Sequence, residues 1–330
     1  MTSPLRIAVL SAWHVHAEEY GRAALDHPDT ELVAVWDDDA DRGQALADKL
    51  GVEFAPSLDE LLARDDLDGV TITTATTAHP EVIGAVIAAG KHVFTEKLLA
   101  TTLADVDDLV AKAAEKKLAL TVSLPRLFHG YTQAVREVLA SGELGDITYS
   151  RVRLSHNGSV ADWLPPRFYD ADETIGISGG VGGALTDLGA HPIYLTNLIL
   201  GGPESTGEYA SVRATYTDVT GRGVEDNASV TVATAAGAIG VLETGFVSGL
   251  SPFSIEVEGT KGGLRYGFDG RTMTVTVGGE TRSVEVPDDV EPPFARWVRD
   301  IQSGNPENET LAAARALTAV VVAANESASA

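Results

Sequence analysis

The sequence contains no cysteine among its 330 residues. This absence excludes a disulfide framework, a zinc site built from thiolates, and a cysteine nucleophile. Basic residues are also scarce, because 24 lysines and arginines stand against 48 acidic residues, which gives a formal net charge of −24. A surface of this charge repels phosphate backbones, so we expect neither nucleic acid nor an anionic membrane as a partner.

Long hydrophobic runs are missing as well. No stretch approaches the roughly 20 apolar residues of a membrane span, and the longest purely apolar runs are short, such as Ala319–Ala324. At the N-terminus, the apolar run Ile7–Leu10 reaches His14 too soon for a signal peptide. We therefore expect a cytoplasmic protein. The hydrophobic fraction of 44% supports two cores, and the length predicts about two domains.

The first part of the chain alternates short apolar runs with longer amphipathic stretches. The predicted strands are 7–10, 32–36, 69–73, 92–95 and 118–123. Apolar runs this continuous are typical of a parallel sheet that is covered on both faces. We therefore predict an α/β, doubly wound dinucleotide-binding (Rossmann) domain over residues 1–124.

The pattern changes after Leu124. From Ile147 onwards a two-residue alternation dominates, with glycines where hairpins would turn, and one predicted helix over 183–200 interrupts it. This pattern predicts an α+β domain over residues 125–330, with an open, mainly antiparallel sheet that serves substrate binding and oligomerisation. The last helices could pack back on the first domain.

A dinucleotide-binding turn normally has glycines after the first strand, and none is present here. The turn Leu10–Ala17 reads LSAWHVHA. Small Ser11 and Ala12 could preserve the amide geometry, whereas Trp13 must point away from the phosphates. Asp37 follows the second strand, where a carboxylate would hold the adenosine ribose hydroxyls. It could equally cap the next helix together with its neighbours.

Two histidines, His14 and His16, follow the first strand. Their spacing is that which opens the metal site of amidohydrolase-type (β/α)8 enzymes, so a metal-dependent hydrolase is an alternative hypothesis. That hypothesis requires βα units to the end of the chain, and the antiparallel second half opposes it. The plain alternative is that both histidines are ordinary polar loop residues.

Three segments carry a family resemblance: Ala89–Ala100 (AGKHVFTEKLLA), Gly182–Pro192 (GGALTDLGAHP), and the ending Phe294–Trp297 (FARW) with a final helix. Their order and spacing resemble the Gfo/Idh/MocA family of NAD(P)-dependent oxidoreductases, which includes glucose–fructose oxidoreductase and inositol dehydrogenase. The family pattern A-G-K-H-V-x-x-E-K-P is kept up to Lys97, with Leu98 in place of the proline. The pattern G-G-x-x-x-D-x-G-x-H-x-x-D is kept except at its last place, which holds Tyr194.

The resemblance implies three catalytic residues, Lys97, Asp187 and His191. Lys97 follows the fourth strand, where open α/β sheets bind ligands, and desolvation there can lower a lysine pKa and make it a proton carrier. The plain alternative is a surface lysine that pairs with Glu96. Asp187 and His191 are four residues apart on a predicted helix, so the carboxylate could orient the imidazole as a base. An ordinary helical pair is the alternative.

The remaining site residues are expected around these three. The predicted cofactor-binding set, which rests largely on the resemblance, is Ser11, Ala12, Trp13, His14, Val15, Asp37, Thr74, His79, Glu96, Lys97 and Arg126. Aromatic and basic residues before the predicted helix could line a sugar pocket. Besides the three catalytic residues, these substrate candidates are His156, Trp163, Arg167 and Tyr169. As loop residues, they could equally pack on a partner subunit.

The resemblance implies an oxidoreductase that acts on a sugar, a sugar derivative or a cyclic polyol. We expect a substrate hydroxyl to lose its proton to His191, assisted by Lys97, in a cleft between the two domains, while the adjacent carbon passes a hydride to the nicotinamide. No metal is expected. NAD is favoured over NADP, because Asp37 repels a 2′-phosphate and no arginine follows it closely. A ligand sensor without catalysis is the alternative on this fold.

We also expect a homodimer or a homotetramer. One face of the antiparallel sheet would remain uncovered by its own domain, and an exposed apolar face usually marks an interface. The residues that could supply this face are Val230, Val232, Val241 and Leu242.

Overall fold

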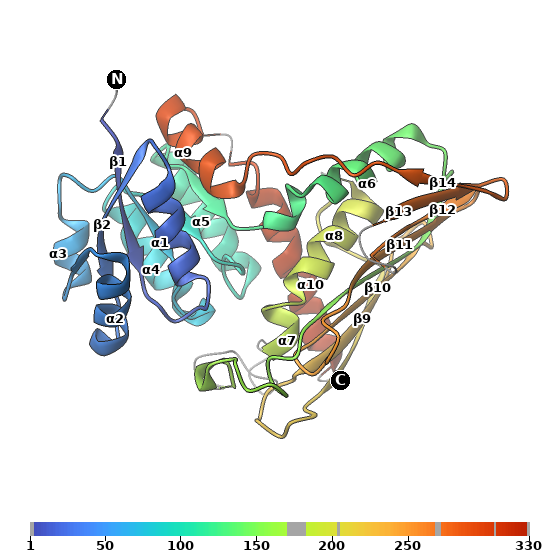
Figure 1. The fold of residues 1–330 in the computed structure, drawn as a ribbon, viewed down its shortest axis with the longest axis horizontal. Coiled ribbons are helices and arrows are strands. Elements are labelled where there is room, and N and C mark those ends of the chain that lie inside the picture. The colour runs from blue at the N-terminus through green and yellow to red at the C-terminus, as the bar shows by residue number, and fades with distance from the viewer. Residues whose placement is uncertain (1–2, 170–182, 203–204, 268–271, 307, 329–330) are drawn as a thin grey trace. The chain divides into compact units, whose positions relative to one another are not determined.

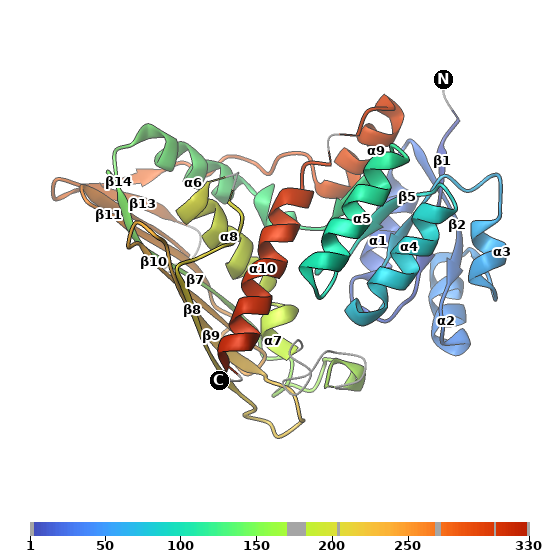
Figure 2. The ribbon, with the colours of Figure 1, turned by 180° about the vertical axis from the view of Figure 1, so that it is seen from behind.

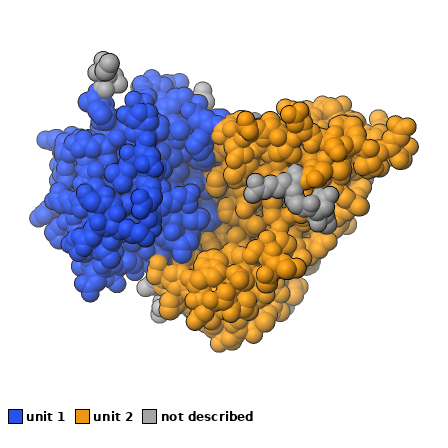
Figure 3. Space-filling view, viewed as in Figure 1, with its two compact units in different colours: residues 1–123, 291–311 blue, residues 124–290, 312–330 orange. Residues whose placement is uncertain are grey.

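A computed structural model describes residues 3–169, 183–202, 205–267, 272–306 and 308–328. The chain divides into two compact units, which Figure 3 shows in different colours. Unit 1 comprises residues 1–123 and 291–311, and unit 2 comprises residues 124–290 and 312–330.

Unit 1 contains a six-stranded parallel sheet in the order β3-β2-β1-β4-β5-β6. Its strands are β1 (Leu5–Leu10), β2 (Thr30–Trp36), β3 (Glu53–Phe54), β4 (Gly69–Ile72), β5 (His92–Thr95) and β6 (Leu120–Val122). Its helices are α1 (Ala17–Asp26), α2 (Ala40–Leu50), α3 (Leu58–Leu62), α4 (His79–Ala88), α5 (Leu103–Glu115) and α9 (Pro293–Ser303). Helices α1 and α2 cover one face of the sheet, and α4 and α5 cover the other (Figures 1 and 2). The predicted doubly wound fold is confirmed; β3 and α3 were too short to give a periodic pattern.

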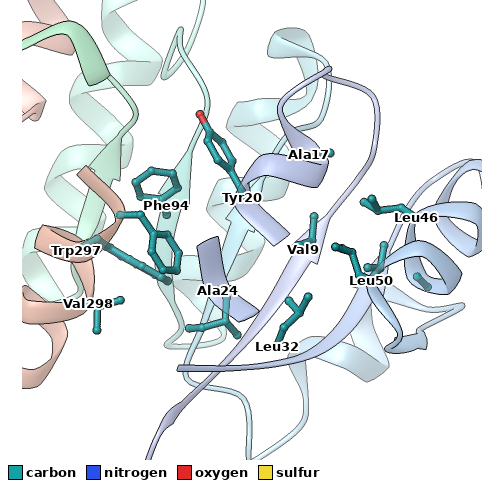
Figure 4. Close-up of a cluster of buried hydrophobic side chains, with 14 of the residues drawn as sticks. Val9, Ala17, Tyr20, Ala24, Leu32, Leu46, Leu50, Phe94, Trp297 and Val298 are labelled. Atoms are coloured by element: carbon teal, nitrogen blue, oxygen red, sulfur yellow. The ribbon is translucent and has the colours of Figure 1, made fainter. Parts of the chain in front are cut away.

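The strand order reverses between the neighbouring parallel strands β1 and β4, so the connections that follow these two strands leave towards opposite faces of the sheet. In open α/β sheets this point is where ligands bind. On one face of this sheet, side chains of β1, β2, α1, α2 and α9 pack into a hydrophobic core (Figure 4). Trp297 of α9 is fully buried and its ring lies 5.9 Å from that of Phe94. A Cβ atom at Gly69 would lie 3.0 Å from the Trp297 ring, which explains a glycine in that strand.

Unit 2 contains an eight-stranded sheet in the order β14-β13-β12-β11-β7-β10-β9-β8. Its strands are β7 (Ile147–Ser155), β8 (Ser211–Thr217), β9 (Asn227–Ala233), β10 (Ile239–Gly245), β11 (Phe253–Gly259), β12 (Gly262–Tyr266), β13 (Met273–Val277) and β14 (Glu280–Val284). Its helices are α6 (Gly130–Ser141), α7 (Gly183–Thr186), α8 (Ala190–Gly201) and α10 (Leu311–Ala328). All neighbouring strands are antiparallel except β7 and β10. The predicted mainly antiparallel sheet is confirmed.

The predicted single helix over 183–200 is wrong, because the structure has α7 and α8 with a turn between them. The Gly189 amide donates to the carbonyl of Ala184 at 2.8 Å, which closes the turn. A Cβ atom at Gly189 would lie 2.5 Å from the Leu185 carbonyl oxygen, so this tight bend requires glycine. Asp187 lies in the turn and His191 lies on α8. The two residues therefore do not share one face of a continuous helix.

The residues expected to form an exposed apolar face are for the most part buried within the chain. Val230, Val232 and Leu242 are at most 2% exposed, and only Val241 is partly exposed. On the opposite face of β10, the exposed Ile239 and partly exposed Val241 lie beside polar side chains, and there Arg151 pairs with Glu243 at 2.7 Å. The prediction that Val230, Val232 and Leu242 belong to an exposed apolar face is therefore wrong. A homodimer or homotetramer stays a prediction, which light scattering tests against the 34.6 kDa mass of one chain.

Among the residues that the structure describes, one helix, α10, is long and apolar enough to cross a membrane, judged by length and composition alone. In the structure this helix packs against β8. Asn325 accepts a hydrogen bond from the Tyr216 hydroxyl at 2.8 Å, and Ser327 accepts one from the Ala214 amide at 2.8 Å. Leu317 and Val320 are fully buried. Helix α10 therefore serves as a packed helix of unit 2.

Candidate active site

The turn after β1 adopts a glycine-like conformation at a serine. Ser11 has a φ of +74°, in the left-handed region that glycine normally occupies. Its side chain stabilises this turn, because the hydroxyl oxygen accepts from the Trp13 amide at 3.1 Å and the hydroxyl donates to Asp37 at 3.3 Å. Trp13 is buried in unit 1, whereas Val15 is exposed. The turn therefore forms at the expected place without a glycine.

Asp37 is held by several donors at the end of β2. Its buried carboxylate accepts from the Ala12 amide at 2.5 Å, the Asp39 amide at 2.9 Å, and two nitrogens of Arg42 at 2.6 and 2.9 Å. Burial alone would raise the pKa of Asp37, but these donors, Arg42 foremost, lower it. The side chain that caps α2 is Asp39, which accepts from the Arg42 amide.

The premise that no arginine follows Asp37 closely is therefore wrong. Arg42 comes five residues later, on the first turn of α2, and its guanidinium also reaches Asp38 at 2.8 Å. It neutralises the carboxylate that would repel a 2′-phosphate. The sequence could have indicated this contact between Arg42 and Asp37. In a helix that starts at residue 40, residue 42 lies in the first turn, close to the end of the preceding strand.

Lys97 follows β5 and is buried, with 5% of its surface exposed. Its Nζ lies 3.1 Å from Glu96 Oε2, so the pair with Glu96 exists but is not on the surface. Glu96 also contacts His16 Nδ1 at 2.8 Å and accepts a hydrogen bond from the Tyr20 hydroxyl. Burial alone would raise the pKa of Glu96, but the positive charges of Lys97 and the nearby histidines hold it well below its usual range. Its carboxylate in turn raises the pKa of His16 against the effect of burial.

Two buried polar atoms next to Lys97 point to a ligand. Thr74 Oγ1 and His79 Nε2 have no hydrogen-bond partner among the residues that the structure describes. The other His79 nitrogen, Nδ1, contacts the Leu98 carbonyl at 2.7 Å, and burial lowers the pKa of His79 to about 4, so the ring is neutral. A buried polar group left unpaired costs about 1–3 kcal/mol, which a bound ligand can recover. Both atoms follow β4, at the switch point of the sheet, so the residues present fit a dinucleotide there.

His14, His16 and Glu96 form a cluster whose ligand atoms all lie within 4.8 Å of one another. Histidine nitrogens and a carboxylate oxygen are suitable zinc ligands. However, the Lys97 ammonium already neutralises Glu96 and repels a cation. The barrel that the metal-dependent hydrolase hypothesis requires is also absent from the described fold, so that hypothesis is wrong.

In unit 2, His191 and Tyr194 lie one turn apart on α8 and contact each other. The distance from His191 Nδ1 to the Tyr194 hydroxyl is 2.7 Å. The same hydroxyl oxygen accepts a hydrogen bond from the Arg126 amide at 3.2 Å. Both side chains are buried, with Tyr194 at 1% and His191 at 8% exposure. Sequence analysis had recorded Tyr194 only as a departure from the family pattern.

The side chain of Arg126 contacts other residues than its main-chain amide does. The guanidinium lies over the Phe253 ring, 4.5 Å from its centroid, and donates to the Tyr131 hydroxyl at 3.0 Å. Together with His129, these residues line a pocket of about 1040 Å³ in unit 2. The structure therefore packs the predicted cofactor residue Arg126 among aromatic rings of unit 2.

Of the predicted substrate residues, His156 and Trp163 lie together. The His156 ring stacks on Phe246 at 4.8 Å and lies 4.7 Å from the Trp163 ring. Burial lowers the pKa of His156, and the charge of Asp187 partly offsets this, which places Asp187 near the same cluster. Trp163 is 49% exposed, so a ligand could stack on it.

Tyr169 has a packing role in the structure. Its hydroxyl lies 2.8 Å from Ser159 Oγ, and the Arg222 guanidinium covers its ring at 4.5 Å. Arg167 is partly exposed on the same short helix, Pro166–Tyr169. Gly182, the first residue of the second motif, lies outside the described residues.

Sequence analysis missed Glu225, a buried carboxyl that holds the segment before Asp187. Its Oε1 accepts from the Leu185 amide at 3.1 Å, and its main-chain carbonyl accepts from the Ala184 amide at 2.9 Å. Gly183 has a φ of +63°, and a Cβ atom there would lie 2.1 Å from the Glu225 carbonyl oxygen. Burial raises the pKa of Glu225 to about 8. No sequence pattern indicates this contact, because it joins two segments about 40 residues apart.

These features define a class: a dinucleotide-binding α/β unit with a buried lysine at its ligand edge, joined in one chain to a mainly antiparallel α+β unit. Two family models match the chain. One, an oxidoreductase family with an NAD-binding Rossmann fold, matches residues 5–124, and the other, the GFO/IDH/MocA C-terminal domain, matches residues 132–265. The chain belongs to the Gfo/Idh/MocA family of NAD(P)-dependent oxidoreductases, as the two motifs predicted.

Individual relatives agree with this assignment. The chain is 31% identical to a dTDP-3,4-didehydro-2,6-dideoxy-α-D-glucose 3-reductase from Saccharopolyspora spinosa, over 75% of this chain and 70% of the relative. It is 32% identical to the enzyme of the same name from Streptomyces antibioticus, but that match spans only 61% of this chain and 58% of the relative. A protein of gentamicin A biosynthesis, solved with NAD, is 25% identical with a TM-score of 0.81, over 100% of this chain and 95% of that one.

A further solved structure shares the fold. A 3-ketoreductase from Actinomadura kijaniata, in complex with NADP and TDP-benzene, has a TM-score of 0.82 at 23% identity, over 98% of both chains. Structures with the same fold thus contain either NAD or NADP.

Proposed function

We propose that this oxidoreductase transfers a hydride between a nicotinamide dinucleotide and a carbon of a sugar or sugar-nucleotide derivative. The observation that carries the proposal is the buried Lys97–Glu96 pair at the carboxyl edge of the unit 1 sheet, near Thr74 Oγ1 and His79 Nε2, which have no hydrogen-bond partner in the described part of the chain. A lysine kept out of water at a ligand edge is placed to exchange a proton with a bound substrate. The names of the relatives support a sugar-derived substrate; a cyclic polyol is the second candidate.

The cofactor would lie along the carboxyl ends of β1, β2 and β4. Ser11 and its neighbours would face the phosphates, Asp37 the adenosine ribose, and Thr74 and His79 the nicotinamide end. When bound, the nicotinamide supplies or accepts the hydride, and the protein positions it. The chain's own contribution is to hold neutral His79 and charged Lys97 beside that position.

Arg42 bears on the choice between NAD and NADP. Because its guanidinium neutralises Asp37, the repulsion of a 2′-phosphate is small, and the same guanidinium can donate to that phosphate. To bind the ribose hydroxyls of NAD, Asp37 must give up one of these donors. We therefore propose that the chain accepts both cofactors, with affinities within about tenfold of each other, a free-energy difference of about 1.4 kcal/mol.

We propose three catalytic residues, as the family motifs imply. Lys97 moves the proton of the reacting oxygen, His191 contacts that oxygen, and Asp187 supports the charge near it. His156 and Trp163 would contact other parts of the substrate, because a half-exposed indole next to a stacked imidazole suits the apolar face of a sugar ring.

Steady-state kinetics on two variants test this proposal. Lys97→Met and His191→Ala are each expected to lose about 10²- to 10⁴-fold in turnover, the usual contribution of a proton carrier. Both variants should still bind NADH or NADPH in a fluorescence titration, because neither residue lies in the turn after β1. Substrates for the assay are aldoses, cyclic polyols and nucleoside-diphosphate 3-keto sugars.

Two matched controls accompany the variants. Lys116→Met removes an exposed lysine of unit 1 whose Nζ donates to the Ala88 carbonyl at 2.8 Å, and His27→Ala removes a histidine at the end of α1. Both controls should keep normal turnover. Folded Lys97→Met and His191→Ala proteins with near-normal turnover would contradict the mechanism and favour a ligand sensor on this fold.

A further inference from the structure

Glu96 is a buried carboxylate of unit 1 whose two oxygens have different partners. Its side chain is 2% exposed, so water has little access to replace a partner that is lost. Oε1 accepts a hydrogen bond from the Tyr20 hydroxyl and lies 2.8 Å from His16 Nδ1. Oε2 lies 3.1 Å from Lys97 Nζ and accepts from the Lys97 main-chain amide, also at 3.1 Å. The partners of Oε1 therefore help to decide where Oε2 points.

The core of unit 1 places the Tyr20 hydroxyl at this oxygen. Tyr20 lies on α1 and is 5% exposed, and its ring meets the Phe94 ring edge to face with 5.0 Å between the centroids. Phe94 belongs to β5, two residues before Glu96, and its ring also packs on Trp297. In Figure 4 the Tyr20 ring lies among these side chains and its hydroxyl oxygen points away from them. Because packing fixes the ring, the position of the hydroxyl is fixed as well.

Of the two groups at Oε1, Tyr20 is the firmer partner. The His16 side chain is 36% exposed, so water competes for its nitrogen, whereas Tyr20 lies in the interior, where a hydrogen bond is stronger. Burial raises the pKa of Tyr20 well above its usual range, so the hydroxyl keeps its proton and donates it to the ionised carboxylate of Glu96 as a hydrogen bond.

We propose that Tyr20 is a positioning residue whose hydroxyl holds Glu96 in the orientation in which Oε2 faces the Lys97 ammonium. This inference rests on the proposed function, in which Lys97 exchanges a proton with the substrate. Tyr20 itself exchanges no proton and is too deeply buried to face a ligand. A carboxylate that accepts a strong hydrogen bond is less basic, so Lys97 is paired with a weakened carboxylate and releases its proton more readily.

The other charged groups around this carboxylate stay in place when only the phenol oxygen is removed. Lys97, His16 and His14 are the groups whose charges act on Glu96 most strongly. Glu19 of α1 acts in turn on His16. A change in the titration of Lys97 that follows the loss of one hydroxyl is therefore attributable to that hydroxyl.

NMR of lysine side chains labelled with carbon-13 at Cε measures the protonation of Lys97 without any assay of activity. The Lys97→Met protein identifies the Lys97 signal by its loss. In Tyr20→Phe, which keeps the aromatic ring, the pH at which Lys97 titrates should rise by about one unit. An unchanged titration in the folded variant would overturn the inference. Because this measurement needs no turnover, it separates failure of the inference from failure of the proposed function.

Steady-state kinetics test whether Tyr20 acts through Glu96. We expect the turnover of Tyr20→Phe to fall about 10- to 100-fold through the misplaced ammonium, with an unchanged Kd for NADH or NADPH. The limb of the pH–rate profile that reports Lys97 should move together with its NMR titration. In a Glu96→Gln background the same substitution should have little further effect, since the carboxylate through which it acts is gone. Full additivity of the two substitutions would contradict the inference.

Tyr216→Phe is the matched control, because it removes another tyrosine hydroxyl, which donates to Asn325 at 2.8 Å in unit 2. It should change neither the Lys97 titration nor turnover, and an equal shift in this control would refute the role of Tyr20. If Tyr20→Phe does not fold, 3,5-difluorotyrosine at position 20 decides. Its hydroxyl is more acidic and donates more strongly, so the Lys97 titration should move down; a titration that stays in place or moves up would refute the role of Tyr20.

Discussion

Arg42 binds Asp37 through two nitrogens, at 2.6 and 2.9 Å, and so neutralises the carboxylate that we propose faces the adenosine ribose. The exposed fraction of the Arg42 side chain is 20%, whereas that of Asp37 is zero. A ligand that arrives at this position therefore meets a partly accessible guanidinium before it meets the carboxylate. This relationship changes the expected cofactor preference from NAD to either cofactor.

Arg42→Ala is expected to shift the preference towards NAD. Without the guanidinium, Asp37 and Asp38 repel a 2′-phosphate, and Asp37 becomes available to the ribose hydroxyls of NAD. A hydrogen bond to a charged group contributes about 1.5–3 kcal/mol, so the ratio of Kd for NADP to Kd for NAD should rise about 10- to 100-fold. Titration of both cofactors by calorimetry measures the ratio. Arg22→Ala, which removes an exposed partner of Glu18, is the control, and an equal ratio in Arg42→Ala and wild type would contradict the assignment.

The sequence predicted the larger elements because they have periodic patterns of their own. Strand Thr30–Trp36 depends on local apolar spacing, and it contains the strand that the sequence predicted over 32–36. The sequence could not predict the break between α7 and α8. That break depends on the Gly189 amide bond to Ala184 and on the anchoring of Leu185 by Glu225, which are contacts rather than patterns.

In the candidate site, too, local motifs could be predicted from the sequence, whereas long-range contacts could not. The motifs pointed to Lys97 and His191, whose surroundings the structure then supplied. Lys97 contacts its neighbour Glu96, and His191 contacts Tyr194, but these partners are themselves held by residues distant in sequence. Tyr20, which contacts Glu96, is 76 residues away from it, and Arg126, which contacts Tyr194, is 68 residues away. Sequence spacing can identify a reactive side chain, but its protonation state depends on groups brought together by folding.

Trp297→Ala is expected to destabilise unit 1. The indole is fully buried against Phe94, Phe294 and the backbone of Gly69, so its removal leaves a cavity in the core of Figure 4. Substitutions of this kind cost about 3–5 kcal/mol. Chemical denaturation measures the loss. Trp163→Ala is the matched control, because that indole is half exposed, and its effect should stay below about 1 kcal/mol. Equal effects of the two substitutions would show that α9 does not stabilise the core of unit 1.

Glu225→Ala should lower turnover by displacing the segment that holds Asp187. The variant removes the acceptor of the Leu185 amide, and an amide left unpaired in the interior costs about 1–3 kcal/mol. Glu225→Gln keeps an acceptor oxygen of the same size and should retain most of the activity. Kinetics and melting curves on the same samples check this; an inactive but folded Gln variant would show that the carboxyl itself is required.

Glu225 should also make the stability of the protein depend on pH. Burial raises the pKa of this carboxyl from 4.5 to about 8, so between these values the folded state binds a proton that the unfolded state has released. Stability from this group is therefore fully present below about pH 4.5 and falls as pH rises to about 8, where the folded carboxyl ionises as well. The amide of Glu225→Gln cannot ionise, so the free energy of unfolding of this variant should decline less than that of the wild type between pH 6 and 8. Chemical denaturation across this range gives the two slopes, and parallel slopes would mean that Glu225 ionises at an ordinary pKa in the folded protein.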